Sequence, residues 1–150
     1  MDTARATADV PDVLSCDSDP QQKIDAIRRG IPAMRLDQLA VRMGTSKEFL
    51  IRSLRLSRAT LNRKERTSTL LSSEESERLL GIENLICAVQ SMVEQSGNPD
   101  GFDAARWLGG WLPAPLPALG GATPGSYMDT IEGQNLVADL LAMTQSGAYA

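Results

Sequence analysis

A long apolar stripe between Ser72 and Gly97 constrains the fold of this chain more than any other feature. Ser72 and Glu75 have the spacing of a capping box, in which a hydroxyl and a carboxylate satisfy backbone N–H groups at the start of a helix. From there to about Glu94, apolar side chains recur with helical spacing at Leu79, Ile82, Ile86, Val89 and Val93. The pattern predicts one long helix, whose stripe is core, a homodimer seam or a spine joining two halves of the chain.

Shorter helices are predicted before the stripe, and their order favours a helix-turn-helix. Apolar residues at helical spacing predict the first, which Gly44 ends: Leu36, Leu39, Ala40 and Met43. Thr45 and Glu48 have capping-box spacing and predict the start of the second. Its buried face would carry Phe49, Leu50 and Leu54. Ser57 is the predicted N-cap of the third, which runs to about Arg66. Short helices with tight connections, the last one basic, match a helix-turn-helix better than a plain bundle.

The third helix carries side chains suited to DNA recognition. Leu61 is predicted to face inward, while polar and basic residues cover the other faces. Residues 47–66 hold seven basic side chains and two acidic ones, whereas residues 97–150 hold one arginine and five carboxylates. A major-groove reading helix uses such side chains for base edges and phosphates. The predicted DNA-binding residues are Ser57, Arg58, Thr60, Arg63, Lys64 and Arg66. The alternative interpretation is a short, solvated basic helix.

The composition argues against an enzyme, a metalloprotein and a membrane protein. The chain has no histidine, and its cysteines, Cys16 and Cys87, are isolated and outside any Cys-x-x-Cys pair. The common zinc and haem ligand sets and the usual general base are therefore missing, and we expect no cofactor. No stretch approaches the roughly 18 apolar residues that a membrane-spanning helix needs. Since the N-terminus also lacks a secretory signal pattern, we expect a cytoplasmic protein.

Breaker residues divide the chain into predicted parts. Residues 1–22 are rich in aspartate, contain Pro11 and Pro20, and are expected to form an N-terminal arm. A short helix is predicted over residues 23–29, ended by a glycine and a proline. The cluster Ser96-Gly97-Asn98-Pro99-Asp100-Gly101 marks a boundary. We therefore expect a helix-turn-helix and dimerisation domain at 23–96 and a second domain at 97–150.

The second part is predicted to be helical as well. One helix is expected over residues 102–108, with Trp107 in the core and Gly109-Gly110 ending it. Alternate prolines from Trp111 to Pro117 then favour an extended path, and Gly120-Gly121 favours a tight turn over a phosphate-binding loop. Thr123-Pro124 supplies an N-cap and a first-turn proline for a final helix. That helix would present Leu136, Val137, Leu140 and Leu141 as its apolar residues. With no strand pattern in the sequence, the predicted fold class is all-α.

Two motifs in this second part resemble the toxin-binding domain of Xre-type antitoxins. They are Ala105-Arg106-Trp107-Leu108 and Pro115-Leu116-Pro117-Ala118-Leu119-Gly120-Gly121-Ala122-Thr123-Pro124. Residues 56–80 resemble the DNA-binding domain of the same family, so the resemblance covers about residues 36–150. Pro115-Leu116-Pro117 departs from the family, which often has asparagine at the central position.

The resemblance implies an all-α, Xre/Cro-like helix-turn-helix domain followed by a small helical toxin-binding domain. It implies an antitoxin that dimerises, binds operator DNA to repress its own operon, and neutralises a RES-domain toxin that consumes NAD, within a larger complex. The predicted toxin-binding residues are Trp111, Leu116, Leu119, Gly120, Gly121, Tyr149 and Ala150. The C-terminal carboxylate and Tyr149 are expected to occlude the toxin's active site. The alternative is a helix-turn-helix regulator whose second domain binds a ligand or only dimerises.

Overall fold

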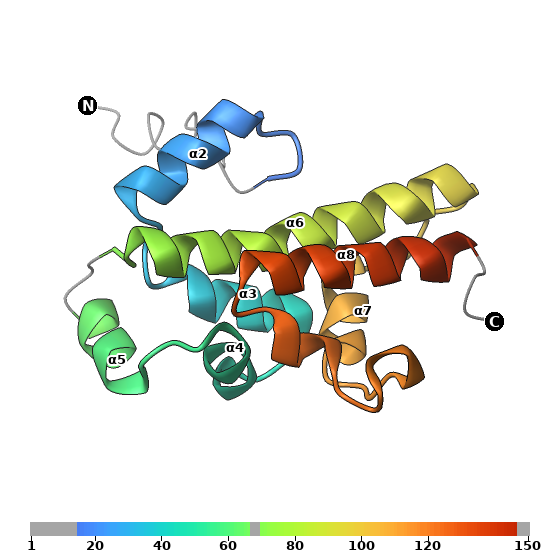
Figure 1. The fold of residues 1–150 in the computed structure, drawn as a ribbon. Coiled ribbons are helices and arrows are strands. Elements are labelled where there is room, and N and C mark those ends of the chain that lie inside the picture. The colour runs from blue at the N-terminus through green and yellow to red at the C-terminus, as the bar shows by residue number, and fades with distance from the viewer. Residues whose placement is uncertain (1–14, 67–69, 147–150) are drawn as a thin grey trace.

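A computed structural model describes residues 15–66 and 70–146 of the chain, and Figure 1 shows their arrangement. Within these ranges the predicted all-α fold is confirmed, and the β pairing consists of an isolated bridge between Pro32 and Leu70. The helices are α2 (Pro20–Arg29), α3 (Arg35–Met43), α4 (Lys47–Leu54), α5 (Arg58–Arg66), α6 (Ser73–Ser96), α7 (Ala104–Trp111), η1 (Pro117–Leu119), η2 (Pro124–Tyr127) and α8 (Ile131–Ser146). None of the helices in the described residues is long and apolar enough to cross a membrane.

The first described helix starts earlier than the sequence pattern predicted. α2 begins at Pro20, so residues 20–22 belong to a helix and not to an arm. The side chain of Asp19 accepts from the Gln22 N–H, and the Gln22 side chain accepts from the Asp19 N–H. This reciprocal cap, with a proline in the first turn, outweighs the polar character of the segment. Residues 1–14 lie outside the described residues.

The apolar side of α3 is buried as predicted, with Leu36 and Leu39 completely inaccessible. Gly44 ends the helix in the left-handed region, at φ 64°. The start of α4 was predicted one residue too early, because its N-cap is Ser46 and not Thr45. The Thr45 N–H donates to the carbonyl of Ala40 and so completes the end of α3. Thr45 therefore belongs to the C-terminal end of α3, and Ser46 is the N-cap of α4.

α6 is the spine that the two halves of the chain share. The predicted capping box of Ser72 and Glu75 is confirmed, and the helix continues to Ser96. Figure 1 shows α8 running beside it, and α2 and α7 also contact it. Its apolar stripe is buried from Leu79 to Val89 and half-buried at Val93, so most of this stripe is core. One hydrophobic core therefore crosses the predicted boundary at residue 97.

A buried ion pair joins α6 to α3. Glu83, which is 2% exposed, accepts from the Arg42 guanidinium through both carboxylate oxygens at 3.0 Å. A buried carboxylate needs a paired charge or several hydrogen bonds to remain ionised in the core. The pair therefore links α3 to the spine at Glu83.

The prediction that Gly109-Gly110 ends the next helix is wrong. Asp103 caps α7 through the Arg106 N–H, and the helix continues through both glycines to Trp111. A Cβ at position 109 would collide with the carbonyl oxygen of Met43 in α3. Gly109 therefore allows the backbones of α7 and α3 to approach closely, which sequence reasoning could not distinguish from a helix stop.

The final helix begins later than predicted. Thr123-Pro124 starts the short helix η2, whereas α8 starts at Ile131. The hydroxyl of Thr130 accepts from the Gly133 N–H at the true start of α8. Leu136 lies about 100° around the helix from Val137, at the edge of the apolar face, and is exposed. Its predicted companions are buried: Val137, Leu140 and Leu141.

The two cysteines, separated by 71 residues in the sequence, form a disulfide. Cys16 precedes α2, Cys87 lies in the middle of α6, and their Cα atoms are 5.4 Å apart. Neither cysteine has a nearby partner in the sequence, so the pairing follows entirely from how the segment before α2 lies on α6. The bond attaches this segment to the spine.

Candidate DNA- and toxin-binding surfaces

The basic helix α5 is held to the molecule by its cap and by one buried side chain among those the structure describes. The Ser57 hydroxyl accepts from the Thr60 N–H, which confirms the predicted N-cap. Leu61 is 3% exposed and joins the core, also as predicted. Ser57, Arg58 and Arg63 are exposed, while Thr60 is half-buried. The predicted DNA-binding residues thus lie on α5 or at its N-cap, and the described basic side chains of this helix, Arg58 and Arg63, are exposed to solvent.

Arg58 already has a protein partner in the free chain. Its guanidinium forms an ion pair with the Glu48 carboxylate on α4, and both side chains are substantially exposed. A phosphate or base edge would therefore compete with Glu48 for this arginine. Lys64 and Arg66 lie in α5, but their side chains are outside the described part of the structure.

The segment after α7 forms a compact loop closed by Leu116. The Leu116 N–H donates to the carbonyl of Ala122, and the Leu116 carbonyl accepts from the Gly121 N–H. Gly120 and Gly121 have φ values of 65° and 92°, which confirms the predicted tight turn. Leu116 and Leu119 are half-buried, whereas both glycines are exposed with open space around them.

The prediction of an extended path starting at Trp111 is wrong in its first residues. Trp111 is the last residue of α7, and Leu112 keeps a helical conformation at φ −58°. Trp107 and Trp111, one turn apart, stack with ring centroids 5.8 Å apart and an interplanar angle of 16°. Trp107 is 39% exposed, so the prediction that it is a core residue is also wrong. Leu108 and Leu112 take the inner positions instead.

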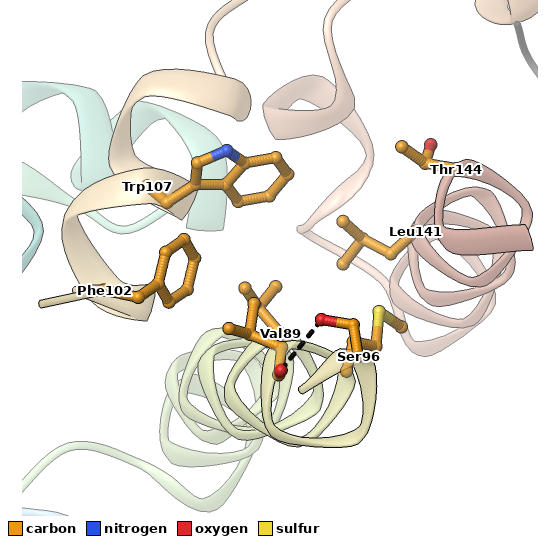
Figure 2. Close-up of a pocket in the computed structure, with 8 residues that line it drawn as sticks. Val89, Ser96, Phe102, Trp107, Leu141 and Thr144 are labelled. Carbon is orange, nitrogen blue, oxygen red and sulfur yellow. Dashed lines mark hydrogen bonds between the residues drawn. The ribbon is translucent and has the colours of Figure 1, made fainter. Parts of the chain in front are cut away.

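Trp107 forms one wall of an apolar cleft between α6, α7 and α8, shown in Figure 2. The cleft has a volume of about 220 Å³ and is lined by Val89, Met92, Val93, Ser96, Phe102, Trp107, Leu141 and Thr144. In Figure 2, Phe102 and Trp107 face Leu141 across the opening, with Val89 at its floor. An exposed aromatic ring over an apolar hollow is typical of a partner-binding site.

Sequence reasoning missed Trp107 and Phe102 as surface residues, although a signal was present. The i, i+4 spacing of Trp107 and Trp111 places both rings on one face of a helix. Leu108 and Leu112 repeat at the same spacing one residue later and can fill the core. Extending the helix through Gly109-Gly110 would have revealed the two faces.

The basic helix and the cleft lie far apart. Figure 1 shows α5 at one end of the molecule and the last turn of α8 at the opposite end. Thr144, at the rim of the cleft, is in that last turn. The predicted binding residues Tyr149 and Ala150 lie outside the described residues, as does the proposed occluding tail.

The comparisons with known proteins match both halves of the chain. Residues 22–83 match the antitoxin Xre-like helix-turn-helix domain, and residues 101–147 match the antitoxin Xre/MbcA/ParS C-terminal toxin-binding domain. A protein of Sphingobium sp. (strain YBL2) named Prs ADP-ribosylating antitoxin is 43% identical over 131 residues, covering 87% of this chain and 82% of the relative. These are antitoxins and not enzymes. The chain therefore belongs to the Xre/MbcA/ParS family of antitoxins, with a helix-turn-helix domain followed by a toxin-binding domain.

Proposed function

We propose that this antitoxin neutralises a RES-domain toxin that consumes NAD and, in the cytoplasm, represses its own operon by binding operator DNA. The observation that supports both activities in one chain is the separation of its two surfaces. The basic helix α5 lies at one end, and the apolar cleft, formed by α6 together with the part that matches a toxin-binding domain, extends toward the other. A toxin seated on the cleft would leave α5 accessible to DNA.

The cleft and the Leu116 loop supply the proposed toxin interface. The stacked rings of Trp107 and Trp111 offer a rigid apolar surface, and such aromatic anchors dominate many interfaces. Leu116 and Leu119 are only partly covered by the chain itself. Gly120 and Gly121 have open space around them, so a partner can approach their backbone closely.

The tail is proposed to complete the inhibition. α8 ends at Ser146, and four residues, Gly147-Ala148-Tyr149-Ala150, follow it. An NAD-consuming enzyme must bind a pyrophosphate with basic groups, so a carboxylate beside an aromatic ring is a suitable occupant of that site. The last turn of α8, to which the tail is joined in the sequence, is close to the cleft, because Thr144 lines the cleft. The tail and the cleft can then act on one toxin molecule.

A truncation tests this part of the proposal. The neighbouring reading frame would be co-expressed with full-length antitoxin or with a version ending at Thr144, while growth and cellular NAD are followed. We expect the full-length chain to restore both and the truncated chain to restore neither, although it still binds operator DNA. A truncated chain that silences the toxin fully would refute occlusion by the tail.

The reaction that is opposed can be determined in the same cells. The Sphingobium relative is named for ADP-ribosylation of Prs, and this transfer consumes NAD just as hydrolysis does. We therefore propose ADP-ribosyl transfer as the toxin's reaction. Labelled NAD should leave its ADP-ribose on a protein in cells that hold the toxin alone. Loss of NAD with no labelled protein would indicate hydrolysis instead.

DNA binding is tested at Arg63. We propose that Ser57, Arg58, Thr60, Arg63, Lys64 and Arg66 contact bases or phosphates of the operator, bound by a homodimer formed through the N-terminal half. Arg63→Ala is expected to weaken operator binding by roughly 1–3 kcal/mol, the usual value of an arginine contact to a base. Arg28→Ala, which removes an exposed arginine from α2, is the matched control. Equal affinities of the two variants at fixed salt would contradict the assignment.

A further inference from the structure

The turn between α4 and α5 carries an unusual backbone conformation. Among residues 15–66 and 70–146, Arg55 is the non-glycine residue with a positive φ, at 54°. The left-handed region is costly for a side chain with a Cβ, so surrounding contacts must hold it there. Because this residue joins the two helices of the helix-turn-helix, its conformation sets the direction in which α5 leaves α4.

Arg78 on α6 holds the carbonyl groups of this turn. Its Nη1 donates to the carbonyl oxygen of Leu54 at 2.6 Å and to that of Arg55 at 3.2 Å. These two carbonyls belong to the last turn of α4, where the helix supplies no partner. A charged donor shared by two such carbonyls fixes both peptide groups at once.

Residues from the toxin-binding half reach the same turn. Asp129, between η2 and α8, forms an ion pair with Arg55, with 3.1 Å between the carboxylate oxygen and Nε. Gln134 in α8 is 8% exposed, and its amide nitrogen donates to the carbonyls of Arg78 and Met128 at 3.2 and 2.9 Å. These contacts close a ring that runs from Arg55 through Asp129, Met128, Gln134 and Arg78 back to Arg55.

We propose that Asp129 and Gln134, which belong to the toxin-binding half, are positioning residues for operator binding. They act through Arg55 and Arg78, and they keep the helix-turn-helix in the geometry that DNA requires. The inference rests on the proposed function of α5 in DNA binding. It goes beyond that function because it makes operator affinity depend on side chains some 70 residues away from α5 in the sequence. These side chains lie in the part of the chain that matches a toxin-binding domain.

Charge removal at Asp129 tests the proposal, because two explanations predict opposite signs. If Asp129 acts only through its charge, Asp129→Asn tightens DNA binding by reducing repulsion of phosphates. If it positions the turn, the same change weakens binding. We expect a weakening of roughly two- to fivefold, the range for one partly exposed ion pair. The experiment titrates full-length protein with the DNA upstream of its own reading frame at fixed salt.

Matched variants separate positioning from loss of structure. Asp139→Asn removes one exposed carboxylate from α8, the helix that follows Asp129, and should leave affinity unchanged or slightly tighter. Asp129→Glu keeps the acceptor and should restore most of the affinity, with all unfolding midpoints close to wild type. Gly81→Ala tests the other branch of the ring, because its Cβ would displace the side chain of Gln134. It should weaken operator binding although alanine favours the helix.

The outcomes distinguish this inference from the function on which it rests. Asp129→Asn binding as tightly as Asp139→Asn, or more tightly, while wild type binds the operator, overturns the positioning role and leaves the DNA-binding proposal intact. Wild type that does not bind the operator refutes the DNA-binding proposal and this inference with it. Equally weak operator binding by Asp129→Asn and Asp129→Glu would also overturn the positioning role. The carboxylate acceptor would then be irrelevant to binding.

Discussion

The helices α5 and α7 are similar in length but are attached to the molecule in opposite ways. α7 buries Ala104, Ala105, Leu108 and Gly109 against α3 and α6, and its backbone contacts the backbone of α3. Among its described side chains, α5 buries only Leu61 and depends on a cap and on a turn held by polar contacts. Few buried apolar contacts imply a low free energy of local opening. The proposed DNA-reading helix is therefore adjustable, whereas the helix that carries the cleft is part of the core.

The largest effect is expected from Gly109→Ala. The new Cβ meets the Met43 carbonyl, a backbone atom that cannot move without shifting α3. We expect a loss of about 3 kcal/mol in the free energy of unfolding, measured by chemical denaturation. Operator and toxin binding should fall together, because the spine and α3 serve both halves.

Gly110→Ala is the control for this prediction. It lies in the same helix, and a Cβ added there would have nothing within 4 Å, so alanine should stabilise α7 by up to about 1 kcal/mol. Equal stabilities of the two variants would show that the contact of α7 with α3 does not limit the fold.

A smaller and more local effect is expected from Leu61→Ala. Removing the buried side chain should cost about 2 kcal/mol, near the lower limit for leucine in a core, because α5 can open by itself. Hydrogen exchange should accelerate in α5 and stay slow in α6, and operator binding should be lost while toxin binding remains. Leu70→Ala, at an exposed leucine, should change neither. If hydrogen exchange in Leu61→Ala accelerated equally in α5 and α6, α5 would unfold together with the core, as α7 is expected to do.

The cleft can be tested without disturbing the fold. Trp107→Ala should reduce toxin affinity by about 2 kcal/mol, as expected for an aromatic anchor, with little change in the unfolding midpoint because the ring is 39% exposed. Calorimetric titration with purified toxin would measure it. Leu136→Ala, an exposed position on α8 outside the cleft, is the control. A similar loss of affinity in both variants would place the interface elsewhere.

The smallest effect concerns the competition for Arg58. Glu48→Gln removes its partner on α4 and should tighten operator binding by about twofold, consistent with an exposed ion pair of less than about 1 kcal/mol. The gain should shrink as salt is raised. Glu132→Gln, an exposed carboxylate in α8, is expected to have no effect. Weaker binding by Glu48→Gln would show that Glu48 orients Arg58 for DNA and does not compete with it.

Local patterns predicted much of the fold correctly. The stripe of α6, its capping box and the buried side of α3 follow from spacing that a helix imposes on neighbouring residues. The Ser57 cap, inward Leu61 and the tight turn at Gly120-Gly121 were predicted for the same reason. In each case, the residues that decide the structure lie within one or two helical turns of one another.

The errors arose where a distant backbone decides the local outcome. Gly109 was predicted to end a helix, yet its backbone packs closely against Met43 in α3, which lies 66 residues earlier in the chain. Trp107 and Leu136 are exposed because neighbouring helices cover only part of the apolar face of α7 and of α8. Helical spacing places residues on a common face, but which part of that face is covered depends on segments distant in the sequence.

An all-α antitoxin of the Xre/MbcA/ParS family could be predicted from the residues alone, because helical periodicity, caps and family motifs are all local in the chain. Three features required the folded chain: which apolar residues form the cleft, the pairing of Cys16 with Cys87, and the contacts of Asp129 with Arg55 and of Gln134 with the Arg78 carbonyl. The disulfide and the two polar contacts join residues that lie roughly 55 to 75 positions apart in the sequence. Their formation depends on how α6 aligns both halves along one core, and no local pattern records that alignment.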